Sequence, residues 1–190
     1  MGQSRPRPSL WKEKSMKTAE IQLTYVIKTT KLMALDSKRT DQCFVPPMCK
    51  HRHLDMANLL PECQPETVPC TISTLALTGS STFLQYAITL LGAPVGSSVK
   101  RVSALLKDRG YPLLLTHFDQ MVVRTDAKLN TDMRTNGIPN FCFLENKDGS
   151  ISMGFAHYKY RMGWYVGILA FDDARYLTRA HRFLVRNYVL

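Results

Sequence analysis

Phe141-Cys-Phe-Leu-Glu-Asn-Lys-Asp-Gly-Ser-Ile-Ser-Met-Gly-Phe-Ala-His-Tyr158 decides the fold of this chain, because it predicts a complete β-hairpin. Two apolar runs, 141–144 and 151–158, are separated by a short polar segment. Within that segment, Asp148-Gly149 is a strong signal for a tight hairpin turn. A hairpin joins neighbouring antiparallel strands, so we expect a mostly antiparallel sheet.

The segments around the hairpin show strand-like and helix-like patterns in mixed order. Apolar and polar residues alternate over 21–28, as in a strand with one buried face. Phe83, Tyr86 and Leu90 repeat at helical spacing before Gly92, a residue typical of a helix C-terminus. The other expected strands are 71–77, 113–124 and 165–171, and the other expected helices are 54–60, 99–109 and 174–186.

This order of elements predicts an α+β fold. We expect a single domain over residues 19–190, with about five mostly antiparallel strands and about four helices packed on the sheet. Residues 1–18 are expected to form a disordered basic tail, because Pro6 and Pro8 block regular structure and apolar residues are few.

Composition favours a binding protein. Of the 190 residues, 45% are hydrophobic, which is enough for a folded core. The formal net charge of +10 favours polyanionic partners such as nucleic acids or anionic membranes. The apolar runs are far shorter than a membrane span, so any membrane contact is expected to be peripheral. Five cysteines without a signal peptide indicate reduced thiols in the cytoplasm or nucleus, and a protein that is not secreted.

The most basic expected element is the helix over 174–186. Its four arginines are spaced to stack in one row along a helix face: Arg175, Arg179, Arg182 and Arg186. Such a row is suited to bind a nucleic-acid backbone or an anionic membrane. The alternatives are a solvated helix face, or a row that carboxylates from elsewhere in the fold cover.

Two other groups extend the expected binding surface. The tail contributes Arg5, Arg7, Lys12, Lys14 and Lys17, and the expected helix over 99–109 contributes Lys100, Arg101 and Lys107. Trp11 is expected to dock into a membrane interface or a pocket on a neighbouring copy, unless it folds back on its own domain.

Aromatic and basic residues are interleaved in one further place. Tyr158-Lys159-Tyr160-Arg161 and Trp164-Tyr165 have the composition with which single-strand binders stack bases and hold phosphates. A strand edge with one buried face explains the same pattern more simply.

No motif for catalysis is present. The chain lacks Gly-x-Ser-x-Gly, a phosphate-binding loop and His-Glu-x-x-His, so we expect neither enzymatic activity nor a cofactor. Residue types that bind zinc occur in one proline-rich segment: Cys43, Cys49, His51, His53, Cys63 and Cys70. Because the Cys-x2-Cys pair of common zinc fingers is absent, buried thiols and surface histidines explain this cluster better than a metal site.

Three stretches resemble the matrix proteins of rhabdoviruses, in particular the smaller cytorhabdovirus and dichorhavirus type of plants. They are Ser73-Thr-Leu-Ala-Leu-Thr-Gly79, Phe83-Leu-Gln-Tyr-Ala-Ile-Thr-Leu-Leu-Gly92 and Ser103-Ala-Leu-Leu-Lys-Asp-Arg-Gly110. They are similar to that family's apolar strand ending in glycine, its aromatic-led helix and its apolar loop before a glycine. The resemblance covers roughly residues 20–172.

The resemblance implies a non-enzymatic structural protein of the virion. It implies that the protein condenses the viral ribonucleoprotein, bridges it to an anionic membrane during assembly and budding, and forms homo-oligomers or a lattice. It also implies that an apolar loop dips toward lipid, at Ala104, Leu105 and Leu106, and that part of the tail docks into a neighbour, for which Trp11 is our candidate. The expected location is the virion and the host cytoplasm or nucleus, peripheral on host membranes.

A second interpretation is a nucleic-acid-binding viral regulatory protein of the silencing-suppressor type, with the zinc site described above as an option. Bound zinc and a monomeric complex with short RNA would favour that interpretation. Lipid flotation and concentration-dependent assembly would favour the matrix interpretation.

Overall fold

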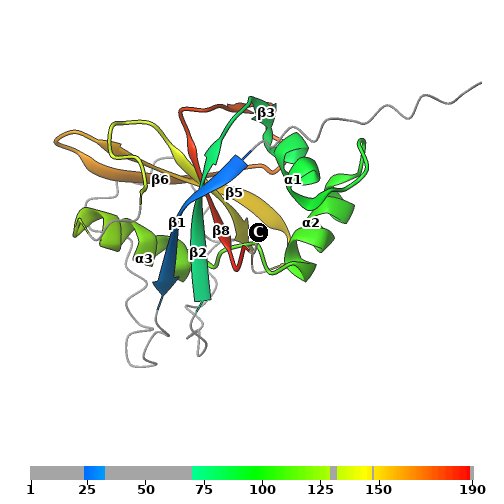
Figure 1. The fold of residues 1–190 in the computed structure, drawn as a ribbon, viewed down its shortest axis with the longest axis horizontal. Helices are drawn as coiled ribbons and strands as arrows, with labels where there is room; N and C mark the ends of the chain where they lie inside the picture. The colour runs from blue at the N-terminus through cyan, green and yellow to red at the C-terminus, as the bar shows by residue number, and fades with distance from the viewer. Residues whose placement is uncertain (1–23, 33–69, 129–131, 147, 189–190) are drawn as a thin grey trace, which may run out of the picture.

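The computed structural model describes residues 24–32, 70–128, 132–146 and 148–188 (Figure 1). Along the chain, the elements are β1 (Thr24–Leu32), β2 (Cys70–Leu77), β3 (Ser81–Thr82), α1 (Phe83–Leu91), α2 (Val99–Asp108), α3 (Leu115–Asp126), β4 (Asn140–Glu145), β5 (Ile151–Lys159), β6 (Gly163–Leu169), β7 (Tyr176–Leu177) and β8 (Arg182–Arg186). The expected helix 54–60 and the expected tail 1–18 lie outside the described residues.

Six strands form one sheet in the order β1-β2-β8-β4-β5-β6. All neighbouring pairs are antiparallel except β4 and β8, which are parallel. β3 and β7 pair separately as a short two-stranded sheet. This architecture confirms the coarser prediction of a mixed α/β domain with a mostly antiparallel sheet. The described residues form six strands in that sheet and two in the small one, where about five were expected, and three helices, where about four were expected.

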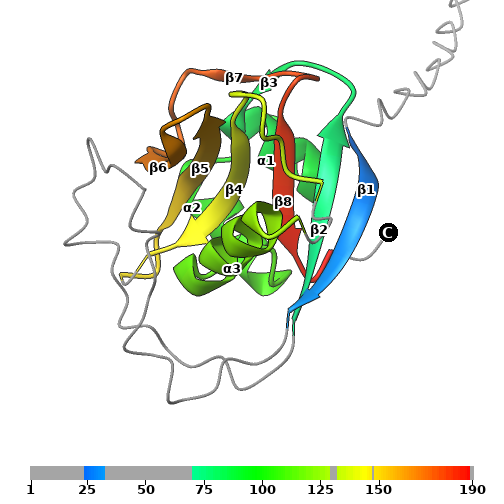
Figure 2. The ribbon, with the colours of Figure 1, turned by 90° about the vertical axis from the view of Figure 1, so that its left-hand side faces the viewer.

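Helices cover both faces of the sheet. Figure 2 shows α3 in front of the sheet and α1 and α2 behind it. Because side chains alternate along a strand, Phe183 on β8 packs into the core beneath α1 and α2, whereas the next residue, Leu184, packs into the core beneath α3. Burial on both faces explains why β4 and β8 carry continuous apolar runs instead of an alternating pattern.

Local capping signals define α1 and α2, at two of the four positions where the sequence predicted helices. The Thr82 hydroxyl accepts a hydrogen bond from the Gln85 amide, and the Gln85 side chain accepts one from the Thr82 amide, which forms a capping box. α1 ends at Gly92, whose φ of 62° is left-handed. The Ser98 side chain caps α2 by accepting from the Arg101 amide.

The expected strand over 113–124 is wrong, because most of this segment forms α3. Phe118, Met121 and Val122 are buried at helical spacing against the sheet. Only Leu113 behaves as a strand residue, in an isolated parallel bridge to Leu144. The run Leu113–Leu115 suggested a strand, but the helix begins within it.

The expected helix over 174–186 is also wrong, because this segment forms β7, a turn and β8. Phe183, Leu184 and Val185 are three consecutive buried residues, which suits a strand covered on both faces and not a helix with one solvated face. Asp173 lies in the turn before β7, where its carboxylate accepts a hydrogen bond from the Arg175 amide at 2.8 Å.

The β4–β5 hairpin matches its prediction and depends on close packing at Gly154. Gly154 pairs with Cys142 in the register. A Cβ atom added at Gly154 would lie 2.5 Å from Leu144 Cδ1 and 2.9 Å from Cys142 Sγ. Both neighbours are buried in the core beneath α3, so neither can move aside without disturbing that core.

Gly154→Ala is therefore expected to lower the free energy of unfolding by about 1–3 kcal/mol, through overpacking. Urea unfolding followed by circular dichroism measures this loss. Adding Cys142→Ala removes one of the crowding atoms, so a double-mutant cycle should show favourable coupling between the two substitutions. Strictly additive losses would contradict the crowding at this position.

Candidate cationic interface

The structure separates the four arginines that were predicted to form one row. Arg175 and Arg179 lie in exposed segments on either side of β7, whereas Arg182 and Arg186 are half-buried at the two ends of β8. Arg175 Nε also lies 3.2 Å from Asp173 Oδ1, which neutralises part of its charge. The predicted row on one helix face is therefore wrong. Arg175 and Arg179 are exposed outside the strands, and Arg182 and Arg186 lie on the face of the sheet that α3 covers.

Arg186 lies close to a buried histidine at the start of α3. Burial and, second, the positive charge of Arg186 lower the pKa of His117 to about 3, from an ordinary value of 6.5. His117 Nδ1 accepts a hydrogen bond from the Leu114 amide at 3.1 Å, as Gln85 accepts from the Thr82 amide at α1. His117 is thus a neutral capping residue of α3, and Arg186 contributes to the electrostatics of the interior.

A neutral His117 makes stability depend on pH. An unfolded chain protonates this histidine below pH 6.5, whereas the folded chain does so only near pH 3. The free energy of unfolding is therefore expected to fall by about 1.4 kcal/mol per pH unit from this residue as the pH drops through that window. His117→Gln keeps a capping acceptor that does not titrate, so its stability should fall less steeply. Parallel curves for the two proteins would show that His117 titrates normally.

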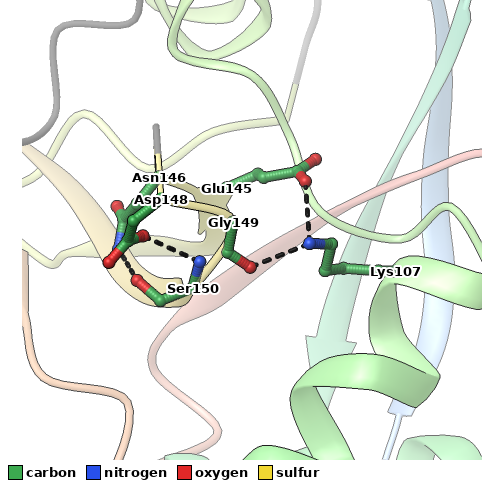
Figure 3. Close-up of polar contacts among 6 residues, drawn as sticks. All are labelled: Lys107, Glu145, Asn146, Asp148, Gly149 and Ser150. Atoms are coloured by element: carbon green, nitrogen blue, oxygen red, sulfur yellow. Dashed lines mark hydrogen bonds and ion pairs between the residues drawn. The ribbon is translucent and has the colours of Figure 1, made fainter.

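Lys107 on α2, which the sequence placed in the binding surface, contacts the β4–β5 hairpin of its own domain (Figure 3). Its ammonium group lies 3.3 Å from the Glu145 carboxylate and donates a hydrogen bond of 2.8 Å to the Gly149 carbonyl. In the same turn, hydrogen bonds from Ser150 are the main cause that lowers the pKa of Asp148. Lys107 therefore holds α2 to the hairpin turn.

A comparison of Lys107 with Lys100 separates the two roles. Lys107→Met should lower the free energy of unfolding by about 1 kcal/mol, because it removes a charge-assisted hydrogen bond and a partly exposed ion pair. Lys100→Met, at an exposed site in the first turn of the same helix, should leave the free energy of unfolding unchanged or raise it by up to about 1 kcal/mol, because a cation there opposes the helix dipole. Thermal unfolding of the two variants measures both effects, and equal losses would refute the assignment.

The start of α2 presents exposed positive charge together with apolar side chains. Lys100 and Arg101 are exposed in its first turn, which contains no acidic residue. Val95, in the α1–α2 loop before the helix, is 98% exposed, and Val99, the first residue of α2, is also exposed. Val95 was missed by the sequence reasoning, and its place between Pro94 and Gly96, two turn-forming residues, is the signal that could have identified it.

The prediction of an apolar membrane loop is wrong. Ala104, Leu105 and Leu106 lie within α2 and not in a loop. Leu106 is fully buried beneath the helix, Leu105 is half-buried and only Ala104 is exposed. Of these three residues, Leu106 therefore packs in the protein core and is not placed to contact lipid.

The β5–β6 turn forms a second exposed cationic and apolar group, here called the 159–162 tip: Lys159, Tyr160, Arg161 and Met162. Tyr160 is 82% exposed and Met162 is 53% exposed. Just behind the tip, Trp164 is buried and packs edge-on against Tyr158, with ring centroids 5.6 Å apart. The interleaved aromatic residues of the sequence thus divide into buried anchors and an exposed tip.

The two exposed groups lie far apart. In Figure 1, the loop between α1 and α2 and the turn between β5 and β6 lie at opposite ends of the longest axis. The domain therefore presents cationic and apolar side chains at both ends, with the sheet between them.

Two groups of predicted site residues lie outside the described residues. They are the tail residues Arg5, Arg7, Trp11, Lys12, Lys14 and Lys17, and the zinc-binding candidates Cys43, Cys49, His51, His53 and Cys63. Cys70 is buried on β2, in the core beneath α3. Within the described ranges, no group of three or more His, Cys, Asp or Glu residues could hold a metal ion. Among the helices that the structure describes, none is long and apolar enough to cross a membrane.

No protein-family model, curated protein or solved structure matched the chain. The resemblance to rhabdovirus matrix proteins thus stays a prediction from the sequence. A function has to be argued from the surface that the fold presents.

Proposed function

We propose that this chain is a viral matrix-type assembly protein, which self-associates and bridges a ribonucleoprotein to an anionic membrane. The observation that carries the proposal is the presence of exposed cations in two separate segments, Lys100 and Arg101 in the first turn of α2 and Lys159 and Arg161 at the β5–β6 turn. The α1–α2 loop, which leads into α2, and the β5–β6 turn lie at opposite ends of the longest axis (Figure 1). A protein that binds one polyanion needs one cationic surface. Two surfaces on opposite ends can hold two polyanions at the same time.

The helix dipole supports a binding role for the α2 end. The N-terminus of a helix carries a partial positive charge, so cations there destabilise the helix by about 0.3–1 kcal/mol each. The first turn of α2 holds Lys100 and Arg101 without a compensating acidic residue. A bound phosphate would reverse this unfavourable arrangement, because it would interact favourably with the cations and with the helix dipole.

Weak individual contacts favour self-association. Each cation near an anionic membrane contributes about 1 kcal/mol, so two cations at one end of the domain give only weak, salt-sensitive attachment. Linked copies would bind the same surface many times over, which raises the overall affinity without new contacts. Assembly is therefore a natural part of the proposed function.

Flotation of labelled RNA tests bridging directly. RNA is mixed with the full chain and with vesicles of phosphatidylcholine and phosphatidylserine, and the mixture is centrifuged through a density gradient. We expect RNA to float only when both protein and anionic vesicles are present, and to stop floating as salt rises. If RNA and vesicles instead displace one another from the protein, bridging is wrong and a nucleic-acid-binding regulator is favoured.

Charge reversal at the α2 end tests its part in the bridge. Lys100→Glu with Arg101→Glu should abolish RNA flotation but leave one of the two binary interactions, with RNA or with vesicles, largely intact. Lys31→Glu with Lys128→Glu changes the net charge equally at exposed positions outside α2, and serves as the matched control. Equal effects of the two pairs would indicate that only net charge matters, and would remove α2 from the proposal.

A further inference from the structure

We propose that the 159–162 tip is the site that contacts the anionic lipid bilayer, with Tyr160 and Met162 entering the headgroup layer while Lys159 and Arg161 bind lipid phosphates. This inference rests on the proposed function and assigns one of its two ligands to a defined part of the fold.

Strand pairing and aromatic packing hold the base of the tip. Lys159 and Gly163 form the last pair of the β5–β6 ladder, and the Met162 amide donates a hydrogen bond of 3.0 Å to the Lys159 carbonyl. The packing of Trp164 against Tyr158 anchors the base of the turn to the core beneath α3. Figure 1 shows the β5–β6 turn projecting from the body of the domain. Its side chains can thus reach a surface before the rest of the domain does.

The charge of the tip suits an anionic surface. No acidic residue occurs in the chain between Asp148 and Asp172, so the whole of β5, the turn and β6 carries only basic charges. Lys159 and Arg161 flank the exposed Tyr160 and Met162. Aromatic and apolar side chains beside cations match the interfacial zone of a bilayer, where an apolar layer lies just below phosphate groups.

The aromatic geometry favours lipid over nucleic acid. The Arg161 guanidinium lies 5.4 Å from the centre of the Tyr160 ring, and Lys159 Nζ lies 5.1 Å from the centre of the Tyr165 ring. A nucleobase that stacked on these faces would have to compete with a cation that is already there. Met162 adds apolar surface but no hydrogen-bonding group that could read a base.

The backbone of the turn provides a clean test. Arg161 has a left-handed φ of 64°, a conformation that glycine adopts without steric cost. Arg161→Gly therefore removes the charge while it keeps or stabilises the turn. Weaker lipid binding of this variant cannot be attributed to unfolding.

The experiment measures partition of the full chain onto vesicles of phosphatidylcholine with about one-third phosphatidylserine. Arg161→Gly should weaken partition about fivefold with an unchanged or higher melting temperature, which corresponds to the loss of one membrane-bound cation. Tyr160→Ser with Met162→Ser should weaken it by a similar or larger factor, because the apolar anchors are lost. Arg179→Gly and Tyr176→Ser change exposed residues of the same types outside the tip, and should leave partition within about twofold.

A parallel measurement with single-stranded RNA separates the outcomes. Retained RNA binding by the tip variants, together with weaker vesicle binding, supports the inference. Loss of RNA binding with normal vesicle binding would identify the tip as a nucleic-acid site and overturn it, as would unchanged vesicle partition of all tip variants. If the unaltered protein binds neither vesicles nor RNA, the proposed function itself fails, and this result is distinct from a failure of the tip.

Discussion

β8 lies between β2 and β4 and pairs with both, so the sheet is continuous only when this strand is in place. On one side of it, β1 and β2 form an antiparallel pair, and on the other side β4, β5 and β6 form a meander. Phe183 and Leu184 of β8 enter the two opposite cores, so the same strand also connects the layer of α1 and α2 with the layer of α3. The sheet that lies between the exposed groups at the two ends of the domain therefore depends on this central strand.

The sequence predicted the locally encoded elements and missed those that depend on the whole fold. α1, α2 and the β4–β5 hairpin carry their own capping and turn residues. Arg182 and Arg186, however, are four residues apart, and this spacing places two side chains on the same side of both a helix and a strand. The arginine spacing therefore could not distinguish the two structures, whereas the buried run between these arginines could.

The sequence identified the basic residues of the candidate site, but not which of them the fold leaves exposed. Lys100 and Lys107 belong to the same cationic pattern in the sequence, yet only the fold brings Lys107 onto the hairpin turn. In the same way, strand alternation buries Trp164, and the turn exposes Tyr160. Burial of a given side chain follows from its register and its neighbours, and neither is encoded by the residue type alone.

The central position of β8 has a consequence for folding during synthesis, which runs from the N-terminus to the C-terminus. The ribosome delivers β1, β2 and β4–β6 before it delivers the strand that joins them. Until then, the edges of β2 and β4 lack their central partner, and apolar strands with open edges are prone to pair with other chains. In a nascent chain, pairing of these edges with other chains therefore competes with folding until β8 has been made.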